Sequence, residues 1–250
     1  NRGRRFYHGL VTNLTKRFSQ GLSLSASYTY NYGKNNFARV LPGNSDRYYA
    51  DETDAFNADF DYARDDFPHV LTIHSLWELP VFRGRKDWVG RIVGGWKLNT
   101  IWLLQSGELF VPVSTASYRN GGDFNADGYR NDRPDRPTQS LPSSFSRSEW
   151  LAGPLKASQF PLPDPATPRP GNLPRDAFRL PGYANVDIAF IKEFGVWKES
   201  GKLQLRLESF NAFNRVNLSS VVNRINAANF ASPTGASQNR VVQFAVKFLF

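Results

Sequence analysis

The sequence predicts an all-β fold, an antiparallel up-and-down transmembrane β-barrel with long extracellular loops. In the segment 240–250 every second residue is apolar, so in a strand these side chains share one face. Short and long connections alternate along the chain. No run approaches the roughly 18 apolar residues of a membrane-spanning helix, and the mean hydropathy is negative. Half-apolar strands joined by alternating short and long connections are typical of transmembrane barrels.

The first two strands are predicted at 4–18 and 21–32, with a tight turn between them. In the second strand, small hydroxyl and amide side chains occupy one face, and aliphatic residues grading into tyrosines occupy the other. The aliphatic and tyrosine set is Leu22, Leu24, Ala26, Tyr28, Tyr30 and Tyr32. Small polar groups toward a lumen and apolar groups toward lipid indicate a transmembrane strand. A half-buried strand of a soluble β-sandwich is the alternative.

Five further strands are predicted at 68–79, 95–113, 183–194, 202–213 and 240–250. The connections near residue 20, at 81–94 and at 195–201 are the shorter ones, and those at 33–67, 114–182 and 214–239 are long. If the last strand ends at the periplasmic side, every short connection is periplasmic and every long one extracellular. The segment 114–182 is rich in Pro, Gly, Asn and Asp, and this composition predicts a loop rather than a globular domain. No substantial helix is expected.

Seven strands are too few for a bacterial barrel, which has an even number of at least eight. An open sheet in lipid would also leave two unpaired edges. The chain begins with Asn and contains no Met. We therefore expect residues 1–250 to be the C-terminal part of one larger barrel domain.

The last strand ends on an aromatic residue, as the final strand of an outer-membrane barrel does. Its outward set includes Phe244, Val246, Phe248 and Phe250. We expect these residues to form the assembly signal that the barrel assembly machinery recognises.

Composition excludes several function classes. Without cysteine there can be no disulfide framework, cysteine–zinc site or thiol catalysis. The net charge of +9 is spread through turns and loops rather than clustered, which favours a surface facing solvent, membrane lipid or lipopolysaccharide over nucleic-acid binding.

Five short segments form an ordered set of motifs across most of the chain. They are DFPH at 66–69, GGWKL at 94–98, QSGELF at 105–110, LPGY at 180–183 followed by Asp187 and Lys192, and FNAFN at 210–214 followed by Asn217. Together with the terminal strand, they resemble the TonB-dependent outer-membrane receptors, specifically the Oar-like group with a carboxypeptidase-regulatory-like N-terminal domain. The chain departs from the family at Glu108-Leu109, where the family usually has a residue followed by Pro.

This resemblance implies a 22-stranded barrel of the outer membrane that encloses a plug domain. The TonB–ExbB–ExbD complex, acting through the plug, would drive uptake of a scarce extracellular ligand. The plug and N-terminal domains would lie outside these residues, and the ligand could be a siderophore, an oligosaccharide or a peptide. An outer-membrane adhesin or structural barrel without transport is one alternative, and a soluble all-β carbohydrate-binding domain is another.

One motif in the longest loop has metal-binding character. Oxygen side chains at Asp123, Asn125 and Asp127 are followed by a glycine and by the Tyr129 carbonyl, as in the first half of an EF-hand calcium loop. The twelfth position is Pro134, so the usual bidentate acid is absent. The substitutes are Asn131, Asp132 and Asp135, of which we take Asp132 as the fifth ligand. A loop rich in Asx turns and without metal is the alternative. Ca²⁺ is the one cofactor considered.

Catalysis is not expected. His8, His69 and His74 are scattered, and no zinc-protease, serine-hydrolase or Walker motif occurs. Among loop aromatics, Trp150, Tyr48 and Tyr49 are candidates for stacking on a sugar or peptide.

Overall fold

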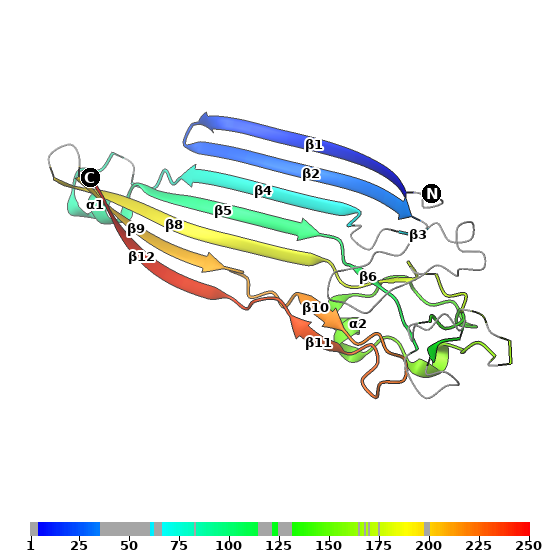
Figure 1. The fold of residues 1–250 in the computed structure, drawn as a ribbon. Coiled ribbons are helices and arrows are strands. Elements are labelled where there is room, and N and C mark those ends of the chain that lie inside the picture. Colours follow the sequence, from blue (N-terminus) through cyan, green and yellow to red (C-terminus); the bar gives the residue numbers. More distant parts are fainter. Residues whose placement is uncertain are drawn as a thin grey trace.

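Seven long antiparallel strands form one open sheet (Figure 1). The computed structural model describes residues 5–35, 61–62, 67–82, 84–114, 122–124, 132–164, 166–167, 169, 171–174, 176–197 and 201–250. The long strands, in spatial as in chain order, are β1 (Arg5–Ser19), β2 (Leu22–Asn35), β4 (His69–Glu78), β5 (Trp96–Gln105), β8 (Tyr183–Trp197), β9 (Gly201–Phe210) and β12 (Val241–Leu249). Each pairs with its neighbour along the chain. The predicted up-and-down order is therefore confirmed.

The remaining elements are short. The two-residue strand β3 (Asp61–Tyr62) extends the pairing of β2. Two small ladders join β6 (Leu109–Phe110) to β7 (Phe178–Arg179) and β10 (Leu218–Val221) to β11 (Pro233–Ala236). The helices are α1 (Trp88–Val93), α2 (Arg147–Ala152) and the 3-10 turn η2 (Ala157–Gln159). No helix in the described part of the chain has the length and apolar character needed to cross a membrane.

The register of the sheet brings the apolar positions of all seven strands onto one face. Leu10 of β1 lies opposite Tyr30, and Tyr28 lies opposite Leu71 of β4. Directly opposed residues share a face of the sheet. The apolar face continues across the sheet through Leu71–Leu104, Leu104–Ala184, Phe190–Leu207 and Leu207–Phe244. The alternation seen separately in single strands is thus in phase over the whole sheet.

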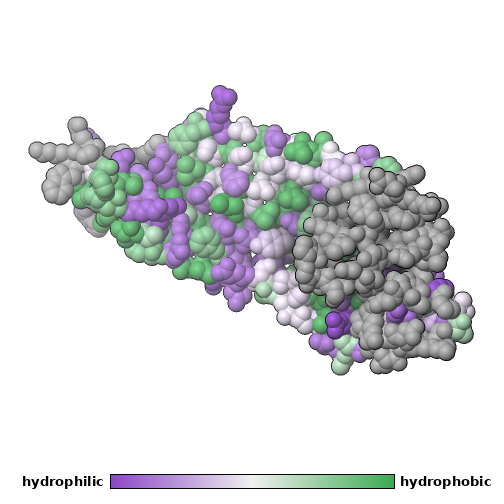
Figure 2. All heavy atoms as spheres, viewed as in Figure 1, coloured by the Kyte–Doolittle hydropathy of each residue, from purple (hydrophilic) through white to green (hydrophobic). Residues whose placement is uncertain are grey.

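The opposite face, called here the polar face, carries the charged side chains of the sheet, with apolar residues such as Leu103 and Ile191 among them. Glu78 and Lys97 form an ion pair of 3.7 Å between β4 and β5, and Arg206 pairs with Glu208 at 2.9 Å within β9. Gln204 also donates a hydrogen bond of 2.9 Å to Glu193 of β8. Figure 2 shows hydrophilic and hydrophobic residues interspersed over the strands on the face turned to the viewer. A sheet with one apolar and one charged face is the wall expected between lipid and an aqueous lumen.

Short connections gather at one end of the sheet and long ones at the other. The two-residue turn after β1, the helix α1, and the paired strand ends Trp197 of β8 and Gly201 of β9 lie at the end where β12 finishes (Figure 1). The helix α2 and the two small ladders, which belong to the long connections, lie at the opposite end. Because periplasmic turns are short and extracellular loops are long in the predicted type of barrel, the end with α1 is called here the periplasmic end and the opposite end the extracellular end.

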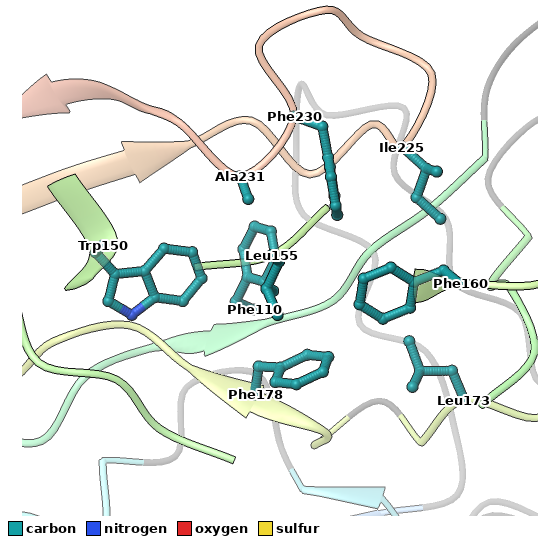
Figure 3. Packing of buried hydrophobic residues seen from close by; sticks show 9 residues of the cluster. All are labelled: Phe110, Trp150, Leu155, Phe160, Leu173, Phe178, Ile225, Phe230 and Ala231. Atoms are coloured by element: carbon teal, nitrogen blue, oxygen red, sulfur yellow. The ribbon is translucent and has the colours of Figure 1, made fainter. Parts of the chain in front are cut away.

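The described parts of the long loops contain a packed core, a feature that the expectation of a loop at 114–182 did not include. Nine buried residues form a hydrophobic cluster, called here the loop core. Its members are Phe110, Trp150, Leu155, Phe160, Leu173, Phe178, Ile225, Phe230 and Ala231 (Figure 3). The segment supplies only part of this cluster, and the rest comes from residue 110 and from the loop after β9. The polar composition of the segment predicted a loop. The packed core was not predicted, because the aromatic residues that form it are far apart in sequence.

Candidate functional site

The first strand-to-loop junction lies where β2, β4 and β5 meet. The Asn31 backbone donates a hydrogen bond of 2.9 Å to the Pro68 carbonyl, and its side-chain amide donates one of 2.8 Å to the Phe67 carbonyl. Across the next strand pair, the Ser106 backbone donates to the His69 carbonyl at 2.9 Å, and the Ser106 hydroxyl accepts from the His69 backbone at 3.1 Å. The DFPH and QSGELF segments therefore meet and close the ends of three strands.

The QSGELF and LPGY segments pack against each other without space for a side chain. A Cβ atom on Gly107 would lie 1.6 Å from the Leu180 carbonyl oxygen, and one on Gly182 would lie 2.8 Å from the Gln105 carbonyl oxygen. The contact is fixed by a hydrogen bond of 2.8 Å from the Leu180 backbone to the Glu108 carbonyl. Arg179 donates a second one of 3.0 Å to the Gly107 carbonyl. Glycine is needed here for close approach of two backbones.

The FNAFN segment ends β9 and ties it to its neighbours. Asn211 has a positive φ of 48°, which Asn tolerates better than most residues and which stops the strand. Its buried side chain donates to the carbonyls of Arg215 and Gln238 at 3.0 and 3.1 Å and accepts from the Arg215 backbone at 2.9 Å. Asn217 in turn accepts from the Ala184 backbone at 3.0 Å and donates to its carbonyl at 2.9 Å. The side chains of the two asparagines thus form hydrogen bonds with backbone groups where the hydrogen bonds between strands end.

These junctions surround a cavity of about 300 Å³ at the extracellular end of the sheet. Leu103, Gln105 and Tyr183 line it from the polar face, since Gln105 lies opposite Tyr183 and Leu103 opposite Asn185. The other lining residues are Phe67, Ser106, Gly107, Glu108, Leu180, Pro181, Leu218, Ser219 and Ser237. Hydroxyl, amide and carboxylate groups beside two aromatic rings can bind a polar organic ligand.

The match of the chain to a known family agrees with this geometry. The family model described as "Outer membrane beta barrel domain" matches residues 1–243. The chain belongs to this family. No match was found among curated proteins or among solved structures.

An outer-membrane barrel must expose its apolar face to lipid, and this one does. Strands of about ten residues rise roughly 33 Å, which spans an apolar band of about 25 Å when they tilt. Of the predicted assembly residues, Phe244 is 65% exposed, Val246 53%, Phe248 51% and Phe250 99%. This outward set fits the lipid face of an outer-membrane barrel, in agreement with the family match. That these four residues are an assembly signal stays a prediction.

The lipid face of this outer-membrane barrel carries aromatic residues near both ends. Near the extracellular end, Tyr28 donates or accepts a hydrogen bond of 2.8 Å with His69 Nδ1, and Tyr30 lies 5.3 Å from the same ring. Near the periplasmic end, Trp77 is paired with Leu98, and Phe248 with Leu203. Aromatic girdles at these two levels are typical of barrel interfaces with the membrane. His69 is therefore part of the outer girdle.

The predicted calcium ligands are only partly described. Asn125, Asp127 and Tyr129 lie outside the described residues. Asp123 and Asp132 are both buried, and the Asp132 carboxylate accepts a hydrogen bond from the Phe124 backbone. No group of three or more acidic or histidine residues that could hold a metal ion occurs among the described residues. Calcium binding stays a prediction.

Asp135, one of the substitutes for the twelfth calcium position, is engaged elsewhere. Both of its carboxylate oxygens accept hydrogen bonds of 2.7 Å from Arg169, and one also accepts from the Asn172 backbone at 3.1 Å. The Arg169 guanidinium holds the pKa of Asp135 below its ordinary value. The Asp135 carboxylate therefore links two parts of the loop through hydrogen bonds, in place of the metal-binding role considered for it.

Sequence reasoning placed one loop aromatic wrongly and missed a set of polar anchors. Trp150 is completely buried in the loop core, so it cannot stack on a ligand, while Tyr48 and Tyr49 lie outside the described residues. The anchoring roles of Asn31 and Ser106 were not predicted. Asn31 lies near the end of a predicted strand and Ser106 lies within the QSGELF motif, and these positions were the only signal in the sequence. Neither residue is charged, and neither belongs to a spacing pattern that would indicate a long-range contact.

Proposed function

We propose that this chain is part of the barrel wall of a TonB-dependent uptake receptor. In that assembly the polar face would surround a plug domain, and the extracellular loops would capture a scarce ligand. Energy would come from the TonB–ExbB–ExbD complex acting through the plug. The barrel itself would carry out no chemical reaction.

The observation that carries the proposal is the assembly of four separate motifs into one belt at the extracellular end of the strands. DFPH contacts QSGELF, QSGELF packs on LPGY, and the segment containing Asn217 bonds to Ala184, just after LPGY. These are the segments that resemble the receptor family, and their order is the family's order. Motifs that fit together at one rim are expected of a shared architecture rather than of chance likeness.

The width of the sheet supports a large barrel. β1 and β12 lie at opposite margins of the open sheet (Figure 1). In an eight-stranded barrel, seven consecutive strands would curl until the first and last were separated by a single strand. A barrel wide enough to hold a plug bends less between neighbours. Further strands would close it, because lipid does not tolerate unpaired strand edges.

The ligand-capturing role is supported by the loop core and by the cavity beneath it. The loop core holds two extracellular connections together above the strand ends, and the cavity of about 300 Å³ opens toward the polar face. A ligand entering from outside would meet this cavity before it reached the lumen. Its hydroxyl, amide and carboxylate lining suits an oligosaccharide, a peptide or a siderophore, and does not choose between them.

Binding to TonB tests the proposal directly. The full-length protein, purified in detergent, would be passed over an immobilised periplasmic domain of TonB, with a general porin as the control. We expect saturable retention of the receptor and none of the porin. If the full-length protein is folded and membrane-inserted but is not retained, the uptake proposal fails and an adhesin or structural barrel is the better reading.

A further inference from the structure

A second cavity lies on the apolar face, near the extracellular ends of β5 and β8. It measures about 430 Å³, and Trp102 and Leu104 of β5 form its floor with their partners Val186 and Ala184 of β8. These residues belong to the lipid-facing set. The cavity therefore opens toward the membrane, on the side of the sheet away from the lumen cavity.

Two arginines from separate loops stand beside this apolar floor. Arg147 lies at the start of α2 and Arg215 follows β9, and both line the cavity. Arg147 donates a single hydrogen bond of 3.4 Å to the Val216 carbonyl. Arg215 donates bonds of 3.2 and 3.4 Å to Asn217 and to the Gly182 carbonyl.

Within the described part of the chain, the side chains of these arginines use only three of their N–H donors. A guanidinium has five N–H donors in a planar fork. Among the described residues, neither arginine forms an ion pair with a carboxylate, and no acidic residue lines the cavity. Positive charge with no acidic partner, placed next to an apolar floor, is complementary to an amphipathic anion.

The rest of the cavity wall suits the membrane interface. Phe213 is 67% exposed, and its ring lies 6.3 Å from that of Trp102. Toward the membrane centre the same face continues through Phe190, Leu207 and Phe244, each of which is exposed. An acyl chain that leaves the cavity downward would therefore stay on apolar surface.

We propose that this cavity binds a lipid A molecule of lipopolysaccharide. A glucosamine phosphate would pair with Arg147 and Arg215, and the adjoining acyl chain would lie over Trp102 and along the apolar face. The cavity is larger than a phosphate ion, and its floor is apolar, so it suits a ligand that carries hydrocarbon beside its phosphate. The extracellular end of the strands meets the outer leaflet, whose lipid is lipopolysaccharide. The inference rests on the outer-membrane location and is independent of TonB.

Native mass spectrometry of the full-length protein in mild detergent tests the site. Bis-phosphorylated lipid A, dephosphorylated lipid A and phosphatidylglycerol would each be titrated onto the wild type and onto the double variant Arg147→Ala/Arg215→Ala. We expect lipid A affinity to fall at least tenfold in the double variant, and dephosphorylated lipid A to bind the wild type weakly. The matched control is Arg91→Ala, which removes an exposed arginine from the periplasmic helix α1 and should leave binding unchanged.

Two further variants keep the test decisive. Because Arg215 also supports the strand ends, the single variant Arg147→Ala is measured as well, and we expect a loss of at least threefold. The variant Arg147→Lys keeps the charge and should retain more binding than Arg147→Ala. Equal lipid A binding by the double variant and the wild type would overturn the proposal. So would equal binding of phosphatidylglycerol and lipid A, which would indicate unspecific attraction of anionic lipid.

Discussion

Substitution of Gly107 by alanine probes the contact that joins two loop ends. The added Cβ would lie 1.6 Å from the Leu180 carbonyl oxygen, so the two backbones must separate by well over 1 Å before the contact becomes ordinary. Two hydrogen bonds cross this contact, from the Leu180 backbone and from the Arg179 side chain. At about 0.5–1.5 kcal/mol each, their loss amounts to about 1–3 kcal/mol, before any strain.

Hydrogen exchange on the full-length protein measures this effect locally. A local destabilisation of about 1–3 kcal/mol raises the open fraction by about 5- to 150-fold, and we expect exchange at the Leu180 amide to accelerate by that factor. Gly195→Ala is the matched control, because a Cβ there meets nothing within 4 Å and its φ is not positive. If the Gly107 variant exchanges at the Leu180 amide no faster than the Gly195 variant does, the close-contact reasoning is wrong.

Four other predictions concern single residues. Asn211→Ala removes three side-chain hydrogen bonds, and we expect the free energy of unfolding, measured by denaturant titration of the refolded protein, to fall by about 2–4 kcal/mol. An unchanged free energy of unfolding would contradict this prediction, because it would mean that water replaces the amide fully. Arg169→Ala should destabilise the loop by about 0.2–1 kcal/mol at neutral pH. Because the folded-state pKa of Asp135 is lowered, this stabilisation is present above the ordinary carboxyl pKa and is lost as the pH falls through the lowered value, so wild type and variant should converge in acid. Hydrogen exchange near the ion pair at several pH values checks this, and a difference that persists in strong acid would contradict it. Asp127→Ala should abolish Ca²⁺ binding in calorimetry if the loop binds calcium, and a parent protein that releases no heat with Ca²⁺ disproves the site. Deletion of Phe250 should lower the amount of protein in the outer-membrane fraction, whereas unchanged insertion would show that the last residue is not part of the assembly signal.

The strand order could be predicted from the sequence because apolar and polar residues alternate within each strand, one set facing lipid and the other facing the lumen. Alternation between Tyr28, Thr29 and Tyr30 needs no knowledge of the neighbouring strands, and a one-residue slip would exchange the faces. The strand ends were predicted less well. The strand expected at 95–113 stops at Gln105, because the next residues leave the ladder to pack against the LPGY segment.

The contacts among the loops could not be predicted in the same way. Phe110 and Trp150 have ring centroids 5.0 Å apart, and Phe160 and Phe230 lie 5.8 Å apart, although long stretches of chain separate the members of each pair. No periodic spacing connects such residues. They also stand among many Pro and Asn residues, a composition that predicts a loop rather than a packed core. The arginine cavity was missed for a related reason, since Arg147 and Arg215 belong to different loops and no sequence pattern links them.

The loop core also has an immunological consequence. Its residues come from two extracellular connections that are held together by buried aromatic rings, with α2 on one connection and the β10–β11 hairpin on the other. The surface above it is therefore a discontinuous epitope. Antibodies raised against peptides from either connection alone would recognise the folded protein poorly. Those raised against the intact protein should lose their target when a core residue such as Trp150 is replaced, even though that residue is never exposed.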